Sequence, residues 1–166
     1  VYRWGLNKGY SEIGTIGLSF GGITSLVAQL PERKVAVFWA PAFYFTKVMS
    51  FWELTFAKIG AKLFPNLTIK RDSKNNEPIL ITGKFMKEMM ELDTDAYLCE
   101  FNTPSLLIQG TADDRIGPKN NYQAFSRFPK DKHHKLIKVE GATHDFDGAH
   151  LDEFISHTMQ WIKRYM

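Results

Sequence analysis

Gly17-Leu18-Ser19-Phe20-Gly21 is the stretch of sequence that decides the fold. A run that favours a strand precedes it (Ile13 to Leu18), and apolar residues at helical spacing follow it (Ile23 to Leu30). A serine at a sharp turn between a strand and a helix presents its hydroxyl in the open, beside a helix N-terminus. We expect both flanking glycines to be required, because a side chain at either position would clash with the neighbouring strand and helix. Ser19 is therefore a candidate nucleophile.

Two later segments place a carboxylate and a histidine directly after predicted strands. Ser105 to Gly110 is typical of a buried strand and leads into Asp113, and Lys135 to Val139 alternates like a half-buried strand and leads into His144. The carboxyl ends of parallel strands meet at one edge of a sheet, where ligand sites gather. A neutral histidine can accept the serine proton, and a carboxylate behind it orients the imidazole. The pattern predicts a serine–histidine–aspartate triad in an α/β fold.

Each of these residues also has a simpler interpretation. Taken alone, Asp113 is a turn-forming residue in an Asp-rich loop, and His144 is an ordinary loop histidine. Asp114, Asp145 and Asp147 are alternative acids, of which the last two can instead cap or precede the final helix. The remaining histidines, in a lysine-rich connector or in the last helical pattern, are His133, His134, His150 and His157. The order serine, aspartate, histidine at three strand ends favours the triad over separate coincidences.

Three segments of the chain resemble the signature segments of the α/β-hydrolase superfamily. They are Ile16 to Gly22, Leu107 to Asp113 and Gly141 to His144. The resemblance implies that Ser19 is the nucleophile, Asp113 the acid and His144 the base. It also implies that the backbone N–H of Phe20 forms half of an oxyanion hole. Asp113 is preferred to Asp114, because the family places its acid three residues after the glycine that ends the strand.

The resemblance covers the whole chain, residues 1–166, but only the second half of that fold. The resemblance implies an eight-stranded, mostly parallel sheet in which the serine follows the fifth strand. Only four main strands are predicted in this chain, namely Ile13–Leu18, Val35–Ala40, Ser105–Gln109 and Lys135–Val139. We therefore expect a partial catalytic domain, the C-terminal half of an α/β-hydrolase fold. Its partner is expected to be the missing N-terminal half, or another chain that covers the exposed sheet edge. That half would supply the second oxyanion donor and any targeting signal, so no localisation is predicted.

Residues 41–103 form a long insertion between the second and third predicted strands. A connection of this length in a compact α/β domain is expected to fold as a subdomain. The pattern predicts an apolar helix over 46–64, a hairpin from 67–70 and 78–82, and a short helix over 84–92. In position the insertion resembles the lid of α/β-hydrolases, and its hairpin resembles the lid of bacterial cinnamoyl and feruloyl esterases and related carboxylesterases.

Aromatic and methionine side chains of the insertion predict a deformable apolar wall. We expect most of them to bury the insertion itself. A minority is predicted to line a substrate pocket for an acyl or aromatic group. The candidates for this pocket are Phe43, Phe45, Trp52 and Phe56.

Composition limits the other classes of function. The 166 residues are 44% hydrophobic and 14% aromatic, which is enough for one domain with a real core. The net charge is +3, and basic residues are interspersed with acidic ones, so the sequence predicts neither a nucleic-acid nor a membrane-surface partner. No apolar run is long enough to span a bilayer. No metal and no cofactor are implied.

The resemblance implies a serine hydrolase of the carboxylesterase type. Its expected substrates are carboxylic esters of small apolar or aromatic acyl groups, cleaved through an acyl-enzyme intermediate. An ester is favoured over a peptide bond because the lid lies inside the domain, whereas prolyl-oligopeptidase-type peptidases usually gate with a separate N-terminal domain. A serine peptidase of that type stays open as an alternative. So does a non-catalytic binding protein of the same fold with a vestigial triad.

Overall fold

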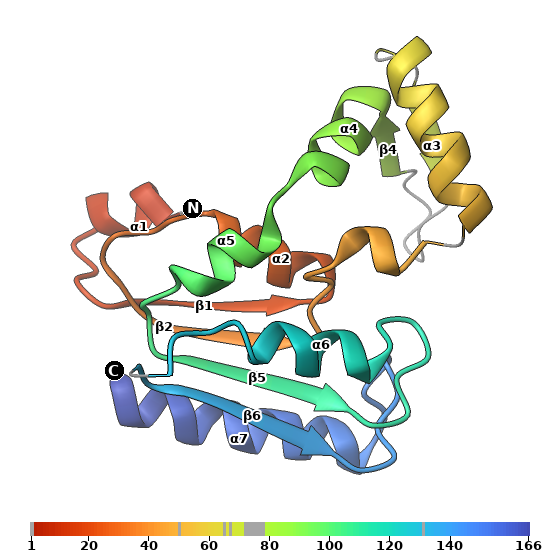
Figure 1. The fold of residues 1–166 in the computed structure, drawn as a ribbon. Coiled ribbons are helices and arrows are strands. Elements are labelled where there is room, and N and C mark those ends of the chain that lie inside the picture. The colour runs from red at the N-terminus through yellow and green to blue at the C-terminus, as the bar shows by residue number, and fades with distance from the viewer. Residues whose placement is uncertain (1, 50, 65, 67, 72–78, 131) are drawn as a thin grey trace. The chain divides into compact units, whose positions relative to one another are not determined.

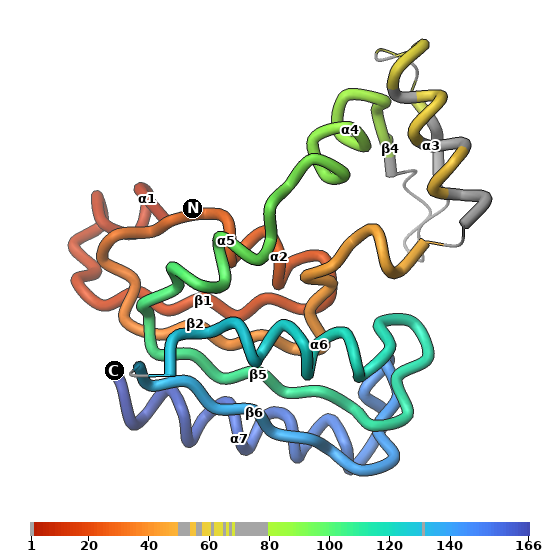
Figure 2. Tube along the Cα trace, in the orientation of Figure 1, coloured from red at the N-terminus to blue at the C-terminus, as the bar shows by residue number. Residues whose placement is uncertain are grey.

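The computed structural model describes residues 2–49, 51–64, 66, 68–71, 79–130 and 132–166. The chain divides into two compact units, which are described separately. The first comprises Val1–Tyr44 and Thr94–Met166, and the second comprises Phe45–Asp93. Figure 2 follows the chain as it leaves the first unit and later returns to it.

Four parallel strands form the sheet of the first unit, in the order β1-β2-β5-β6 (Figure 1). They are β1 (Ile13–Leu18), β2 (Arg33–Trp39), β5 (Ser105–Gly110) and β6 (His134–Val139). Near the ends of the strands, Leu18 pairs with Trp39, and Gly110 pairs with Val139. Because all four strands run in one direction, their carboxyl ends lie at one edge. The predicted strands are confirmed, with bounds within two residues of those expected.

Helices cover both faces of this sheet, which confirms the predicted α/β class. One face carries α2 (Phe20–Val27), α5 (Thr94–Cys99) and α6 (Pro118–Phe125), and the other carries α7 (Ala149–Tyr165) (Figure 1). A short helix, α1 (Tyr2–Asn7), precedes β1. The sequence did not predict α5, which is only six residues long. No helix in the described part of the chain combines the length and the apolarity needed to cross a bilayer.

The core lies on both sides of β2, because alternate residues of a strand face opposite sides of the sheet. On the side of α6, the ring of Phe38 packs edge-on against Phe43 at 5.1 Å between centroids and against Phe101 at 5.6 Å. On the side of α7, the ring of Trp39 packs against Phe154 at 5.5 Å. The continuous apolar run of β2 is thus buried on both faces, as expected for a central parallel strand.

β1 lies at the edge of the described sheet and pairs only with β2. Its side chains Ile16 and Leu18 are 56% and 46% exposed, unlike those of the central strands. Ile16 and Leu18 share a strand face with Gly14, where an added Cβ would lie 3.2 Å from Met166 Sδ at the end of α7. The edge strand therefore presents uncovered apolar surface on the α7 side of the sheet.

The second unit contains a short 3₁₀ helix (Phe45–Lys47), α3 (Phe51–Leu63), β3 (Thr68–Arg71), β4 (Ile79–Thr82) and α4 (Gly83–Glu91). β3 and β4 pair antiparallel, so the predicted hairpin is confirmed; its turn, residues 72–78, lies outside the described residues. The single helix expected over 46–64 is instead divided into the 3₁₀ helix and α3. At the start of α4, Thr82 Oγ1 accepts a hydrogen bond from Phe85 N at 3.1 Å, a typical N-cap.

Within the first unit, hydrogen bonds connect the residues just before the insertion to the residues just after it. Thr94 Oγ1 donates to the carbonyl of Phe43 at 3.0 Å, and Tyr44 Oη donates to Asp95 Oδ1. Burial and the hydrogen bond to Asp95 raise the pKa of Tyr44 to about 12, so its hydroxyl keeps the proton that it donates. The segment that enters the insertion and the segment that leaves it are therefore bonded to each other at the base of the insertion.

Replacement of Phe38 tests the aromatic core. Phe38 is fully buried, so Phe38→Ala should lower the free energy of unfolding by about 3–5 kcal/mol through lost contacts and a cavity. Urea denaturation measures this loss. Tyr10→Ala is the control, because Tyr10 is 60% exposed and its loss should cost less than about 0.5 kcal/mol. Equal effects of the two substitutions would contradict the assignment of Phe38 to the core.

Candidate active site

Ser19 lies in the turn between β1 and α2 in a strained backbone conformation. Its φ of 51° and ψ of −117° are unusual for a residue with a side chain. Ser19 N donates to the carbonyl of Trp39 at 2.9 Å, and the Ser19 carbonyl accepts from Gly22 N at 3.0 Å and from Ala42 N at 2.9 Å. These hydrogen bonds to the end of β2 and to α2 stabilise the strained backbone conformation of Ser19. The predicted strand–turn–helix arrangement around Ser19 is confirmed.

Steric contacts explain two glycines beside Ser19, but not the pair that we expected. A Cβ on Gly17 would lie 2.5 Å from the carbonyl oxygen of Gly21, and a Cβ on Gly22 would lie 2.4 Å from Pro41 Cβ. A Cβ on Gly21 would meet nothing within 4 Å in the described structure. The expectation for Gly21 is therefore wrong, because Gly21 is on the exposed side of α2 and Gly22 is on the side that packs against the end of β2.

Asp113 lies in the loop after β5 and is only 3% exposed. Its Oδ1 accepts hydrogen bonds from the backbone N–H groups of Arg115 (3.0 Å) and Ile116 (2.9 Å). Its Oδ2 accepts one from Gln109 Nε2 at 3.0 Å and lies 2.9 Å from His144 Nδ1. Burial alone would raise the pKa of Asp113, but the hydrogen bonds from His144, the Ile116 N–H and Gln109 outweigh burial and lower it. Asp113 is thus held as a carboxylate.

His144 follows β6 and faces Asp113 with its Nδ1 atom. An ionised carboxylate only accepts hydrogen bonds, so Nδ1 carries the proton and Nε2 is left as the proton acceptor. The side chain is 10% exposed, and the ring of Phe146 lies 6.0 Å from the imidazole. Phe146 has a φ of 52° and packs in turn on Phe154 at 4.3 Å. The strained Phe146 therefore links the histidine loop to the core beneath α7.

The loops that carry Asp113 and His144 are joined by further contacts, among them Gly141 N, which donates to Thr111 Oγ1 at 2.9 Å. Ala112 N donates to the carbonyl of Ala142 at 3.1 Å, and Arg115 Nη2 forms an ion pair with Asp145 Oδ2 at 2.9 Å. Asp145, one of the alternative acids, is thus paired with an arginine. Both partners are about half exposed, so the ion pair orients the loops more than it stabilises them.

The other alternative positions lie apart from the Asp113–His144 contact. Asp114 is exposed, and the carbonyl of Asp147 accepts from His150 N at the entry to α7. His134 Nδ1 lies 2.7 Å from Ser105 Oγ at the opposite ends of the strands, and His157 Nε2 pairs with Glu153 at 3.6 Å. The His134 contact thus joins β6 to β5, and the His157 contact lies within α7.

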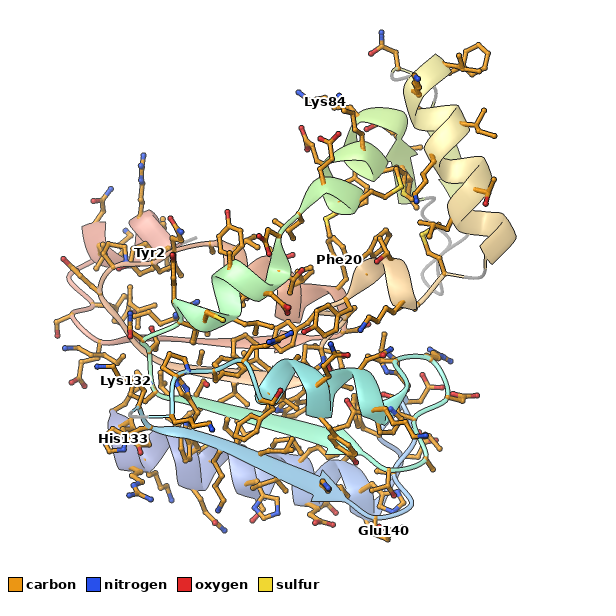
Figure 3. The ribbon with its side chains drawn as sticks, in the orientation of Figure 1. Tyr2, Phe20, Lys84, Lys132, His133 and Glu140 are labelled. Atoms are coloured by element: carbon orange, nitrogen blue, oxygen red, sulfur yellow. The ribbon has the colours of Figure 1, made fainter. Side chains whose placement is uncertain are left out.

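Ser19 and His144 lie at the same edge of the sheet. Figure 3 shows Phe20 and Glu140 where β1 and β6 end, and Tyr2 and His133 at the opposite edge. No hydrogen bond joins Ser19 Oγ to His144 in the described residues, and β2 and β5 separate β1 from β6. Contacts of this kind are often long in unliganded enzymes. The structure thus brings Asp113 and His144 together and places Ser19 on their side of the sheet.

Phe20 is the first residue of α2, directly after Ser19. Backbone N–H groups in the first turn of a helix point out of its N-terminus and favour negative charge there. The position of Phe20 is therefore compatible with the role of oxyanion donor that the resemblance implied.

The four predicted pocket residues lie in different surroundings. Phe43 is fully buried in the aromatic core of the first unit, against Phe38 and Phe128. The ring of Phe45 lies 6.4 Å from that of Phe85 within the second unit. The side chains of Trp52 and Phe56 lie outside those that the structure describes.

A cavity of about 270 Å³ opens at the amino ends of the strands, away from Ser19. Its wall includes Leu30, Phe101 and Arg33, whose guanidinium lies 4.6 Å from the ring of Phe101. Burial lowers the pKa of Arg33 to about 10. Because this cavity is at the wrong edge of the sheet, it takes no part in the candidate site. No group of three or more His, Cys, Asp or Glu side chains among the described residues could hold a metal ion.

Sequence reasoning missed two residues of the site, Gln109 and Asn121. Both are fully buried; the Asn121 amide donates to Gln109, and the Gln109 amide donates to Asp113. The available signal was a glutamine inside the otherwise apolar end of β5, since a buried amide needs hydrogen-bond partners.

Comparison with solved structures agrees with this architecture. A monoacylglycerol lipase from Paleococcus ferrophilus has a TM-score of 0.80 and 19% identity over 99% of this chain and 73% of its own. Est1E from Butyrivibrio proteoclasticus has a TM-score of 0.67 and 16% identity over 92% and 62% of the two chains. The Pyrococcus furiosus esterase PF2001 has a TM-score of 0.68 and 17% identity over 99% and 59%. The protein has an α/β-hydrolase fold, of which this chain spans a part.

A family profile assigns the chain more closely. The profile of the prolyl oligopeptidase family matches residues 8–166, and the chain belongs to that family. No curated individual sequence matches the chain significantly. Family and fold together support a serine hydrolase of the α/β-hydrolase superfamily.

The two glycines that flank Ser19 form a matched pair of positions for a steric test. Gly17→Ala should lower the free energy of unfolding by about 1–3 kcal/mol, because the new methyl group meets the Gly21 carbonyl. Gly21→Ala should be neutral or slightly stabilising, since a helical alanine is preferred to glycine by up to about 1 kcal/mol. Urea denaturation of both variants distinguishes the positions. A larger loss for Gly21→Ala would contradict the steric account.

The lowered pKa of Asp113 predicts a pH-dependent contribution to stability. A carboxyl with a lower pKa in the folded state stabilises that state above its unfolded pKa, and this contribution is lost as the pH falls through the folded pKa. The difference in unfolding free energy between wild type and Asp113→Asn should therefore shrink from about pH 5 downward. Asp114→Asn removes the carboxylate of the exposed neighbour and is the control. If the difference in unfolding free energy between wild type and Asp113→Asn stays constant or increases at acidic pH, the prediction is refuted.

Proposed function

We propose that this protein hydrolyses carboxylic esters of small apolar or aromatic acyl groups. Ser19 acts as nucleophile, His144 as general base and acid, and Asp113 as the carboxylate that orients His144. The observation that carries the proposal is the 2.9 Å contact between Asp113 Oδ2 and His144 Nδ1, at the edge where Ser19 occupies its strained turn. A carboxylate paired with one imidazole nitrogen leaves the other nitrogen to act on a serine hydroxyl.

In the first half of the reaction, His144 Nε2 takes the proton of Ser19 as Oγ attacks the ester carbonyl. Collapse of the tetrahedral intermediate breaks the bond to the alkoxy oxygen, which receives the proton from His144 and leaves as the alcohol. The N–H of Phe20 and the N-terminus of α2 favour the negative oxygen of the intermediate.

In the second half, water replaces the alcohol. His144 takes a proton from the water, the resulting hydroxide attacks the acyl-enzyme, and the bond to Ser19 Oγ breaks. Ser19 then recovers its proton from His144. The products are a carboxylic acid and an alcohol. Ser19 and His144 thereby return to their starting protonation states.

An ester is our first choice of substrate because the compact Phe45–Asp93 unit interrupts the sequence of the catalytic domain. Its aromatic side chains, with Phe45, Trp52 and Phe56 as candidates, are proposed to contact the acyl group. Several proteins of similar fold are described as esterases or lipases, and one is described with ferulic acid bound. These likenesses, below 20% identity, support the choice only through the fold.

A serine peptidase is the second candidate, and the family match is the observation that favours it. The same three residues would cleave an amide, with His144 protonating the leaving amine instead of an alcohol. p-Nitrophenyl esters of graded acyl length, compared with dipeptide and prolyl amides, distinguish the two candidates. Turnover of the amides alone would replace the esterase proposal with the peptidase.

We also propose that β1 pairs with a further strand of the same fold. β1 is an edge strand of the described sheet, whose outer backbone N–H and C=O groups can bond to an added strand, and its exposed Ile16 and Leu18 favour further covering of this region. The relatives of similar fold extend beyond the part that this chain matches. The additional segment would also supply the second oxyanion donor.

Replacement of the nucleophile tests the proposed reaction directly. Ser19→Ala should lower ester turnover by about four to six orders of magnitude, because no other group can form the acyl-enzyme. It should also abolish labelling by a fluorophosphonate. Ser11→Ala, at an exposed serine in the loop before β1, is the control and should keep full activity. Undiminished turnover in Ser19→Ala would refute the assignment, and a wild type that is neither active nor labelled would favour a non-catalytic binding protein.

A further inference from the structure

Gln109 is a fully buried polar side chain in the strand that carries the acid loop. It is the penultimate residue of β5, and its neighbour Ile108 belongs to the apolar core. A buried amide without hydrogen-bond partners destabilises a fold, because nothing replaces the hydrogen bonds that it makes to water in the unfolded chain. The hydrogen-bond partners of Gln109 therefore explain why its amide can be buried at this position.

Both ends of the Gln109 amide are hydrogen-bonded. Nε2 donates to the carbonyl of Gly110 at 3.1 Å and to Asp113 Oδ2 at 3.0 Å. Oε1 accepts from Nδ2 of Asn121, which is fully buried in α6. The three side chains form a continuous chain from α6 through β5 to the carboxylate.

These partners permit only one orientation of the amide. Turned over, Gln109 would place Oε1 against the Gly110 carbonyl and the Asp113 carboxylate, which are both acceptors. With Nε2 facing these two acceptors, Gln109 Oε1 faces Asn121 and accepts from its Nδ2, whereas Asn121 Oδ1 is buried without a hydrogen-bond partner among the described residues. The Gln109 N–H that faces Asp113 Oδ2 is therefore fixed by the Gly110 carbonyl, the carboxylate itself and Asn121.

The Asp113 carboxylate is consequently held at both oxygens. Backbone N–H groups of Arg115 and Ile116 fix Oδ1, and Gln109 fixes Oδ2, the oxygen that faces His144 Nδ1. Without Gln109, the carboxylate could rotate about its bonds to the backbone N–H groups and turn Oδ2 away from the imidazole.

We propose that Gln109, oriented by Asn121, is a positioning residue that aims Asp113 Oδ2 at His144 Nδ1. This role rests on the proposed function, because it matters for turnover only if Asp113 and His144 are the acid and base. Gln109 acts through Asp113 and does not touch substrate.

Two substitutions of Gln109 separate positioning from packing. Gln109→Met keeps the length without a donor, and should lower kcat about 10- to 100-fold with little change in KM. Gln109→Glu keeps the shape, but its carboxyl can donate to Asp113 only while protonated, because an ionised carboxylate only accepts hydrogen bonds. The adjacent Asp113 carboxylate favours this protonated form at low pH, and the donor is lost as the pH rises. The activity of Gln109→Glu relative to Gln109→Met should therefore fall as the pH rises. Parallel profiles for the two variants would indicate packing alone and overturn the proposal.

A spectroscopic measurement tests the same role without any turnover. The proton between His144 Nδ1 and Asp113 should give a far-downfield ¹H resonance, assigned by its absence in His144→Gln. Gln109→Met and Asn121→Leu should shift or broaden this resonance. Asn120→Leu, at the partly buried neighbour on α6, should leave it unchanged. If Gln109→Met does not fold, the pair Gln109→Met with Asn121→Leu removes both polar partners and is read in the same way.

The two measurements distinguish the possible failures. An inactive wild type whose resonance responds to Gln109→Met would refute the esterase proposal and leave the positioning role intact. An active wild type whose resonance and kcat are unaffected by Gln109→Met would refute the positioning role alone.

Discussion

The parallel pairing of β2 with β5 is the interaction on which the rest of the first unit depends. It joins Ala36 to Ser105 through Trp39 to Ile108, and so crosses the whole length of the insertion. The segment before the insertion carries Ser19, and the segment after it carries Asp113 and His144. Only this pairing connects the two segments within the described sheet. Because both strands are buried on both faces, their hydrogen bonds are shielded from water, and the serine and the histidine share one edge.

Much of this arrangement could be predicted from the sequence, because strand burial and strand ends leave clear patterns. The run before Ser19 gave β1 with its observed bounds, and the apolar run after Arg33 indicated a strand covered on both faces. The contact of Asp113 with His144 follows from parallel strands that end at one edge. For these features, the sequence pattern of apolar runs and strand ends is sufficient to predict the positions seen in the fold.

Other features could not be predicted, because they depend on which atoms meet across the fold. Gly21 fits the sequence motif better than Gly22, yet only Gly22 faces Pro41. Periodicity shows that Gln109 is buried but does not name Asn121 as its partner. Phe43 lies among aromatic residues at the start of the insertion, and its place in the core depends on Phe128 from a distant segment. The role of each of these residues can be assigned only when the residue that it contacts across the fold is known.

The hydrogen bonds that join Phe43 to Thr94 and Tyr44 to Asp95 have a consequence for how such a protein can change. They close the loop at its base, independently of what lies between. The entropy of closing a loop grows only with the logarithm of its length, at about 0.6 kcal/mol for each doubling. Residues 45–93 can therefore lengthen, shorten or be exchanged at little thermodynamic cost to the sheet. The fold thus separates the part that fixes chemistry from a part that evolution can vary freely.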